Sequence, residues 1–272
     1  MTARLFDFGG RPVERHWTVA SLRTLKGTGR RAVQTTAETR EEAAAAHAAG
    51  IGMLVCRAAS VPQVRSHAPH AFLTAALGFD AAITADEMLR AAFGAVAAGA
   101  DAVITGRSPA MVEVLAREEI PVMGHLGFVP RKSTWRGRVR AVGRDAAEAK
   151  ALAEAFRRLE DAGAFAVEAE LVAQDALAAI APRTGLVVVS LGSGPAGEVA
   201  FLFQDDVCGG PGRLPRHARA YGDVAALQAR VHEERVRALG AWTADVEAGT
   251  FPAAAQSVAM HPGEADRLAG SL

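Results

Sequence analysis

The chain has 272 residues, half of them hydrophobic and 22% charged, so it can bury a large core and is not a disordered polyelectrolyte. Thirty basic residues balance thirty acidic ones, which disfavours a general nucleic-acid binder. No apolar run reaches the length of a membrane span, and the polar first ten residues do not fit a signal peptide. Two cysteines, Cys56 and Cys208, exclude a disulfide framework and a four-thiolate metal site. We therefore expect a cytoplasmic protein that binds neither nucleic acid nor membrane.

From residue 32, short β-prone runs alternate with alanine-rich helical runs, as a parallel α/β fold requires. The predicted strands are Ala32–Ala37, Gly52–Cys56, Ala71–Leu77, Ala102–Thr105, Pro121–His125, Ala164–Glu170 and Leu186–Leu191, with a short eighth element near Asp206–Cys208. The predicted helices are Glu41–Ala49, Ala85–Ala98, Ala110–Glu118, Ala146–Ala162 and Gln174–Ala181. Three of these helices are followed by a glycine that suits a left-handed C-terminal cap, namely Gly50, Gly99 and Gly163.

Both ends of the chain differ from this central rhythm. Residues 1–31 are polar and irregular, with one short helix expected over Trp17–Leu25. The segment Asp223–Ala248 predicts a closing helical pair broken near Gly240. We therefore divide the chain into an extension (1–31), a barrel (32–222) and C-terminal helices (223–272) that pack on the barrel or on a neighbouring subunit.

Seven or eight β/α units in about 240 residues fit a (β/α)₈ barrel better than an open sheet. A doubly wound sheet would carry a glycine-rich fingerprint after its first strand. The segment after the first predicted strand is Glu38–Glu41, which contains no glycine. Because barrels place their chemistry at the C-terminal ends of the strands, the residues at those ends are the candidates for function.

Several phrases in order resemble the ketopantoate hydroxymethyltransferase family. The clearest is Ile120–Pro130, whose Gly-His-Leu-Gly ends a strand and precedes a proline. The other matching phrases are Ala162-Gly163-Ala164 with a strand reaching Glu170, Val187–Leu191 with Gly192-Ser193-Gly194, Asp206 with Leu214-Pro215-Arg216, and Val246–Pro252. The resemblance covers about residues 18–258 and implies a (β/α)₈ barrel of the phosphoenolpyruvate/pyruvate-type superfamily in a homo-oligomer. It also implies an aldol addition to a metal-chelated keto acid, with methylenetetrahydrofolate as the one-carbon donor.

The sequence differs from the family at the positions of the family's metal ligands. The resemblance places carboxylate ligands after the second strand, at the end of the third and at the end of the fourth. Here those positions read Cys56-Arg57-Ala58, Thr74–Leu77 and Ile104-Thr105-Gly106. Mg²⁺ needs oxygen ligands, usually with one or two carboxylates, and Arg57 would repel a cation. The sequence therefore predicts that the family's Mg²⁺ site is lost, unless Asp80 or another carboxylate rebuilds it.

The remaining strand ends supply the candidate site. Glu170, at the family's catalytic position, is the predicted base, and His125 the predicted partner of a carbonyl. Alternatively, both are structural: Glu170 pairs with an arginine, and the phrase around His125 is kept for its turn. The candidate substrate-binding residues are Arg57 and Arg107 as an anion clamp, Ser193 and Thr36. Cys56 is a candidate nucleophile, although a free cysteine is more often a small buried hydrophobe.

Three functions follow from this set. The first is a divergent, metal-independent enzyme that makes or breaks carbon–carbon bonds on a small 2-oxo acid or related carboxylate. The second is a true 3-methyl-2-oxobutanoate hydroxymethyltransferase with a rearranged metal site. The third is a non-catalytic paralogue that binds a small metabolite.

Overall fold

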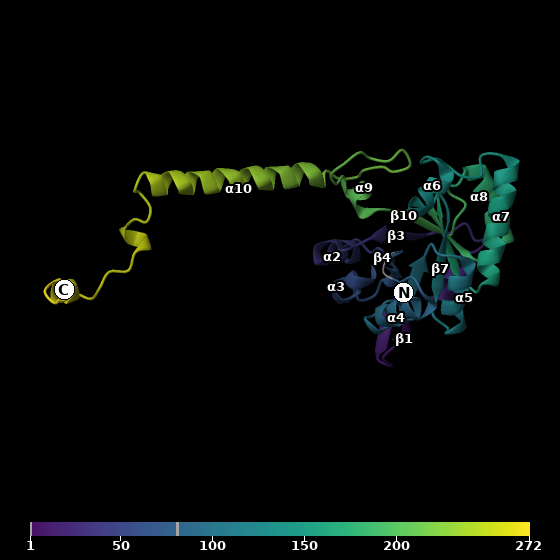
Figure 1. Cartoon of the computed structure of the whole chain (residues 1–272), viewed down its shortest axis with the longest axis horizontal. Helices are drawn as coiled ribbons and strands as arrows, with labels where there is room; N and C mark the ends of the chain where they lie inside the picture. Colours follow the sequence, from purple (N-terminus) through teal and green to yellow (C-terminus); the bar gives the residue numbers. More distant parts are fainter. Residues whose placement is uncertain (1, 80–81) are drawn as a thin grey trace.

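The computed structural model describes residues 2–79 and 82–272, and its centre is a closed barrel of eight parallel strands (Figure 1). The first strand of the barrel pairs with its last, which closes the sheet in the order β10-β3-β4-β5-β6-β7-β8-β9. The strands are β3 (Ala32–Thr36), β4 (Met53–Arg57), β5 (Phe72–Ala76), β6 (Ala102–Thr105), β7 (Val122–Gly127), β8 (Ala166–Glu170), β9 (Val187–Leu191) and β10 (Val199–Leu202). The predicted barrel is confirmed. Asp80 lies outside the described residues.

Alternation along each strand divides the core into two layers. Met53 and Val55 of β4 join the cluster inside the barrel, whereas Leu54 and Cys56 join the cluster between strands and helices. Both faces of a strand are therefore buried, which explains why the strands read as nearly continuous apolar runs. The residues that end each strand on the inner face meet at one mouth of the barrel.

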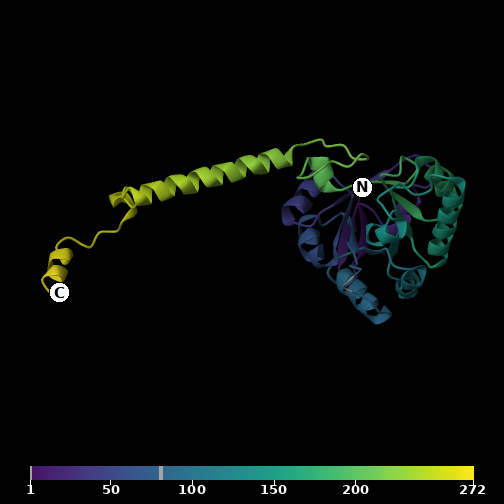
Figure 2. The ribbon, with the colours of Figure 1, turned by 45° about the horizontal axis from the view of Figure 1, so that its top comes forward.

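Helices cover most of the outer layer (Figure 2). Three of the longer barrel helices begin at threonine or aspartate side-chain caps, at Thr39, Thr84 and Asp145. Gly50, Gly99 and Gly163 have positive φ, as their position after a helix predicts. The longer barrel helices are α2 (Arg40–Ala48), α3 (Val61–His67), α4 (Ala85–Ala97), α5 (Pro109–Arg117), α7 (Ala146–Asp161) and α8 (Gln174–Ile180). The shorter segments are α1 (Val19–Arg23), η1 (Ala58–Ser60), η2 (Pro130–Lys132), α6 (Ser133–Arg136) and η3 (Ala181–Arg183).

The structure corrects the predicted eighth element. The last barrel strand is β10, which follows the glycine-rich turn after β9 directly. Asp206–Cys208 lies in the helix α9 (Gln204–Cys208), so Asp206 does not end a strand. The run Val199–Leu202 is only four residues long and has no helix between it and β9, so the β/α rhythm did not reveal it.

The N-terminal extension is also more ordered than predicted. Its strands β1 (Ala3–Phe6) and β2 (Pro12–Arg15) form an antiparallel hairpin. The buried Arg15 donates to Asp101 at 2.8 Å, and Arg65 donates to the other oxygen of Asp101 at 2.6 Å. This charge network fixes the hairpin to the start of β6.

The C-terminal segment leaves the barrel. The predicted helical pair is one continuous helix, α10 (Val224–Glu247), which passes through Gly240 without a break. It projects away from the barrel and is followed by η4 (Ala254–Gln256) and α11 (Glu264–Ala269) (Figure 1). None of its residues is buried, so this structure does not place the helix against the chain's own barrel. Packing on a neighbouring subunit remains a prediction. Among the described residues, no helix combines the length and apolar character needed to cross a membrane.

Candidate functional site

Two neighbouring strands bring one histidine and two glutamates together at the C-terminal end of the barrel. His125 lies opposite Glu168 in the β7–β8 register, and Glu170 follows on the same face two residues later. His125 Nε2 lies 3.0 Å from a carboxylate oxygen of Glu170 and 3.6 Å from one of Glu168. The two predicted catalytic residues are therefore in direct hydrogen-bonding contact, and Glu168 is an additional member that the predicted site did not include.

The cluster is buried, and burial changes its acid–base chemistry. Burial raises the pKa of Glu168 to about 7; the negative charge of Glu170 adds to this, and His125 opposes it. For His125, burial alone would lower the pKa. The hydrogen bond that His125 donates to Glu170 and the charges of both glutamates outweigh burial, so the pKa of His125 is raised above its ordinary value. The site therefore favours the protonated form of His125 and contains, in Glu168, a carboxyl group suited to proton transfer near neutral pH.

The Gly-His-Leu-Gly phrase has a structural reason as well. Gly127 has positive φ, and a Cβ there would lie 2.2 Å from the carbonyl oxygen of Glu170. That carbonyl accepts a hydrogen bond from the backbone of Phe128 at 2.8 Å. A Cβ on Gly124 would collide with Leu159 of α7. The two glycines thus permit the close approach of β7 to its neighbours, and this approach brings His125 to Glu170.

Ser193 does not face a substrate. Its hydroxyl is buried, donates to the Ala169 carbonyl at 2.7 Å and accepts from the Val172 backbone at 2.8 Å. The serine therefore ties the loop after β9 to the end of β8. The structure does not support its assignment as a substrate-binding residue, because the hydroxyl is buried and its one proton is already donated.

Cys56 is not placed as a nucleophile. Its side chain belongs to the layer between strands and helices, on the opposite side of β4 from the barrel interior. Burial, reinforced by the charge of Glu38, raises the pKa of its thiol to about 12. The thiolate is the reactive form of cysteine, so the structure contradicts the predicted nucleophile.

The remaining predicted residues lie around the barrel mouth. Arg57 is exposed at the end of β4, and its side chain contacts no hydrogen-bonding partner in the described ranges. The Arg107 guanidinium donates to the carbonyls of Phe79, Ala82 and Ile83 at 3.0–3.4 Å and so organises the loop after β5. Thr36 Oγ1 accepts from the backbone of Gln204 at 3.0 Å. Substrate binding by Arg57, Arg107 and Thr36 remains a prediction.

The residues at the family's metal positions do not fit that metal. The ends of β4, β5 and β6 present Arg57, Ala76 and Gly106, which offer no carboxylate oxygen. A different group has the dimensions of a metal centre: ligand atoms of His125, Glu168 and Glu170 all lie within 4.8 Å of one another. The sequence analysis did not identify this group, because Glu168 and Glu170 converge with His125 only through strand register.

Lys132 is a further residue that the predicted site lacks. It ends η2, is half-buried, and lines a cavity of about 590 Å³ together with His125 and Trp135. Burial, and then the charge of Arg107, lowers the pKa of its ammonium group. Only its rarity in the sequence, as one of three lysines against 27 arginines, set it apart beforehand.

Comparisons with known proteins agree with this architecture. A family model described as "Ketopantoate hydroxymethyltransferase" matches residues 57–254. A 3-methyl-2-oxobutanoate hydroxymethyltransferase of Cenarchaeum symbiosum is 35% identical over 64% of this chain and 65% of its own length. Another, of Gluconacetobacter diazotrophicus, is 36% identical over 54% of this chain and 51% of its own length. The chain thus spans about half to two thirds of these relatives.

A solved structure shows a similar fold at low identity. The carboxyl transferase domain of Rhizobium etli pyruvate carboxylase, determined with pyruvate and biocytin, superposes with a TM-score of 0.53 and 14% identity. The match covers 69% of this chain and 42% of that one. The likeness shows that the two proteins share the barrel fold.

Proposed function

Because the chain belongs to the ketopantoate hydroxymethyltransferase family, we propose that it catalyses aldol-type carbon–carbon bond chemistry on a small 2-oxo acid or related carboxylate. The observation that carries this proposal is the contact between His125 and Glu170 at the C-terminal mouth of the barrel. A base and a hydrogen-bond donor within 3.0 Å of each other are the two groups that enolisation beside a carbonyl requires.

In this proposal Glu170 is the base that removes the proton from the carbon next to the carbonyl. His125 donates a hydrogen bond to the carbonyl oxygen and stabilises the negative charge that develops there. Its raised pKa supports this role, since a protonated imidazole is the better donor. A carboxylate oxygen of Glu168 lies 3.6 Å from the same Nε2 atom, so its negative charge favours the protonated imidazole.

Arg57 is proposed to hold the carboxylate of the substrate. It is a cation at the end of β4 whose guanidinium is exposed, and guanidinium groups bind carboxylates through two parallel hydrogen bonds. Arg107 is proposed as the second half of the anion clamp, with Thr36 as a neutral neighbour. Methylenetetrahydrofolate is the one-carbon donor that family membership suggests.

A specific observation favours a second candidate, a true 3-methyl-2-oxobutanoate hydroxymethyltransferase with a relocated metal. One nitrogen and two carboxylate oxygens converge at His125, Glu168 and Glu170, and a ligand set of this kind suits a divalent transition metal better than Mg²⁺. A metal held there would polarise the keto acid. Glu170 would then be a ligand in place of the base.

Proton exchange separates these candidates. The protein is incubated with 3-methyl-2-oxobutanoate in D₂O, with Mg²⁺ or Mn²⁺ and again with EDTA, and loss of the C3 proton signal is followed by NMR. We expect exchange that survives EDTA and is lost in Glu170→Gln. Exchange that requires metal would establish the second candidate instead. No exchange under any condition would contradict both and leave a metabolite-binding paralogue, to be examined by thermal shift with other carboxylates.

A further inference from the structure

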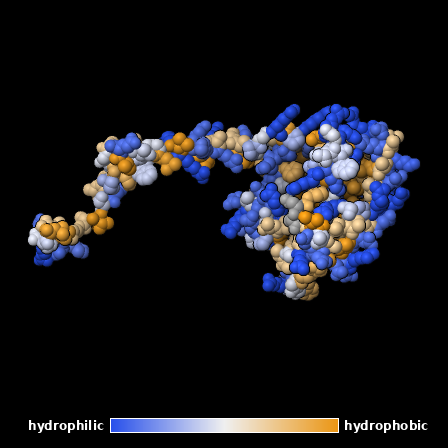
Figure 3. Space-filling view, viewed as in Figure 1, coloured by the Kyte–Doolittle hydropathy of each residue, from blue (hydrophilic) through white to orange (hydrophobic). Residues whose placement is uncertain are grey.

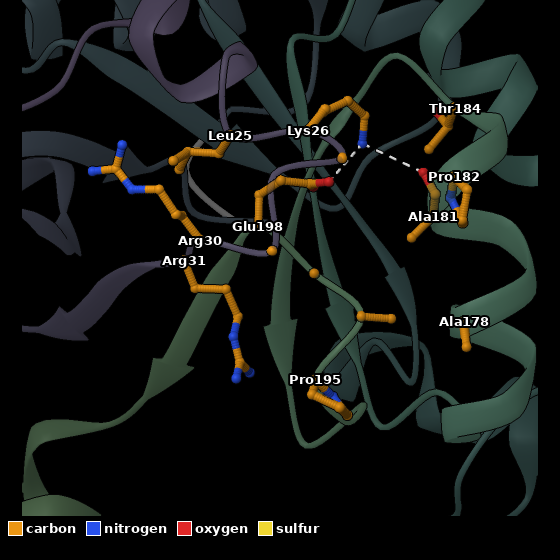
Figure 4. A pocket seen from close by; sticks show the side chains of 14 residues that line it. Leu25, Lys26, Arg30, Arg31, Ala178, Ala181, Pro182, Thr184, Pro195 and Glu198 are labelled. Carbon is orange, nitrogen blue, oxygen red and sulfur yellow. Dashed lines mark hydrogen bonds and ion pairs between the residues drawn. The ribbon is translucent and has the colours of Figure 1, made fainter.

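The three lysines of the chain occupy different environments. Lys26 is bound to Glu198 at 3.0 Å and to the Ala181 carbonyl, beside a cavity at the N-terminal end of the barrel (Figure 4). Lys150 is exposed on α7. Lys132 is half-buried at the opposite, C-terminal end, and its amine makes no hydrogen bond or ion pair to any residue in the described ranges. It alone combines burial with an amine that is not engaged.

The neighbours of Lys132 are cations. The charge of Arg107, from the loop after β6, acts on it, and Arg131 and Arg136 flank it along the chain. Its own charge opposes protonation of His125 on β7. Burial lowers the pKa of its ammonium group first, and Arg107 lowers it further. Desolvation and an adjacent cation are the two means by which lysines become nucleophilic amines near neutral pH.

The cavity beside Lys132 connects it to the proposed catalytic pair. Its lining includes His125 of β7, Val129 of the following loop and Trp135 of α6, and its volume is about 590 Å³. This is within the range of small-molecule sites and exceeds what a small 2-oxo acid needs. The Lys132 and His125 residues therefore line one cavity, and Glu170 is hydrogen-bonded to His125.

We propose that Lys132 binds the 2-oxo acid covalently, as a Schiff base between its Nζ and the C2 carbonyl carbon. This inference rests on the proposed function and names the residue that receives the carbonyl. The neutral amine attacks C2 and forms the C–N bond, while the carbonyl electron pair moves to oxygen, which takes a proton from the attacking nitrogen. His125 donates the proton with which that hydroxyl leaves as water, and the protonated imine results.

The imine then takes the place of a metal as the electron sink. When Glu170 removes the C3 proton, the electron pair of the C–H bond moves into the C2–C3 bond, and the C=N pair moves to nitrogen. The resulting neutral enamine is the carbon nucleophile for a one-carbon unit at the oxidation level of formaldehyde. Addition restores the imine, and water releases the product and the free amine. No oxidant or reductant takes part.

Reductive trapping tests this assignment. The full-length protein is incubated with 3-methyl-2-oxobutanoate and sodium cyanoborohydride, and intact-mass and peptide analysis follow. We expect one adduct per chain, with the mass of the acid minus water plus two hydrogens, on the peptide that contains Lys132. The adduct should be lost in Lys132→Arg and kept in Lys150→Arg, which makes the same replacement on an exposed helix. Thermal unfolding of both variants checks that they fold.

The outcomes distinguish this inference from the proposed function. If no adduct forms, or if it persists in Lys132→Arg, the Schiff base is overturned. C3 exchange that continues in that variant would leave the proposed function intact. If the adduct forms on Lys132 but no C3 proton exchanges, the carbonyl-binding role of Lys132 is supported and the assignment of Glu170 as base is overturned.

Discussion

The barrel and the C-terminal helix α10 use apolar side chains in opposite ways. In the barrel, alternating strand residues fill one cluster inside the sheet and another beneath the helices. In α10, Leu227, Val231 and Trp242 are all at least half exposed, and apolar groups are visible along the projecting arm (Figure 3). A helix that exposes this much apolar surface needs a partner.

The barrel has a matching gap. No helix in the described ranges joins β9 to β10, and Val33 on the outer face of β3 is 50% exposed. The uncovered strands and the unpartnered helix belong to the same chain but do not meet in it. The difference teaches that the barrel strands and helices bury one another, whereas the apolar side chains of α10 stay exposed in the described part of the chain. We therefore expect a homo-oligomer in which α10 covers the barrel of a neighbour.

The largest expected effect is on catalysis, which should depend on the barrel and not on α10. Glu170→Gln should lower the rate of C3 proton exchange by about 10²–10⁴-fold, because it removes the base while preserving the shape of the side chain. Trp242→Ser in α10 should leave the exchange rate per folded site within about twofold, since general acid–base chemistry resides in the barrel. Both rates are measured by NMR in D₂O. Equal losses in the two variants would show that the arm contributes to the site.

The next largest expected effect is on stability, which should depend on the barrel core and not on α10. Phe156 of α7 is 1% exposed and belongs to the outer core cluster. Phe156→Ala should lower the free energy of unfolding by about 3–5 kcal/mol, because it leaves a cavity. Trp242→Ala should change that of the dilute chain by less than about 0.5 kcal/mol, as an exposed position does. Urea unfolding of both variants measures these two free-energy changes. A large loss from Trp242→Ala at low concentration would mean that α10 packs within its own chain.

The third effect is a pH dependence inside the barrel. The pKa of Glu168 is raised to about 7, so the folded state retains a proton that the unfolded state releases above pH 4.5. The free energy of unfolding should therefore fall by up to about 3 kcal/mol as the pH rises from 4.5 past 7. The raised pKa of His125 acts with the same sign at the upper end. Glu168→Gln should flatten the profile; parallel profiles would contradict the assignment.

The smallest effect concerns association through α10. Trp242→Ser should raise the dissociation constant of the oligomer by at least about tenfold, as expected for loss of an aromatic anchor at an interface. Light scattering coupled to gel filtration over a dilution series measures it. Val258→Ser, at a fully exposed position beyond the helix, is the control. A monomer at all concentrations, or equal effects of both variants, would refute the proposed role of the arm.

The sequence predicted the barrel because its elements are local. Strand runs, helix caps and glycines such as Gly50 and Gly163 are set by neighbours along the chain. The break predicted near Gly240 did not occur, since a single glycine in a long helix lowers its stability without ending it. The four-residue β10 was missed because no helix separates it from β9.

The site was predicted only in part, because the sequence does not show which way each side chain points or how deeply it is buried. His125 and Glu170 were identified from their strand ends and lie in contact. Cys56 is adjacent to Arg57 and therefore points to the other face of β4, a distinction that depends on strand phase. Ser193 donates a hydrogen bond from the loop after β9 to the Ala169 carbonyl of β8. A glycine-rich turn in the sequence does not predict this bond. The importance of Lys132 depends on its burial beside Arg107, which only the tertiary fold creates.

The central claim is that the cluster of His125, Glu168 and Glu170 at the barrel mouth receives a 2-oxo acid. The most direct measurement is the NMR signal of the His125 imidazole, assigned by its loss in His125→Gln, during titration with 3-methyl-2-oxobutanoate. The account predicts that this signal shifts to saturation while that of His261, in the exposed C-terminal segment, stays in place. A His125 signal that remains unchanged while the acid binds elsewhere, or does not bind, would contradict it.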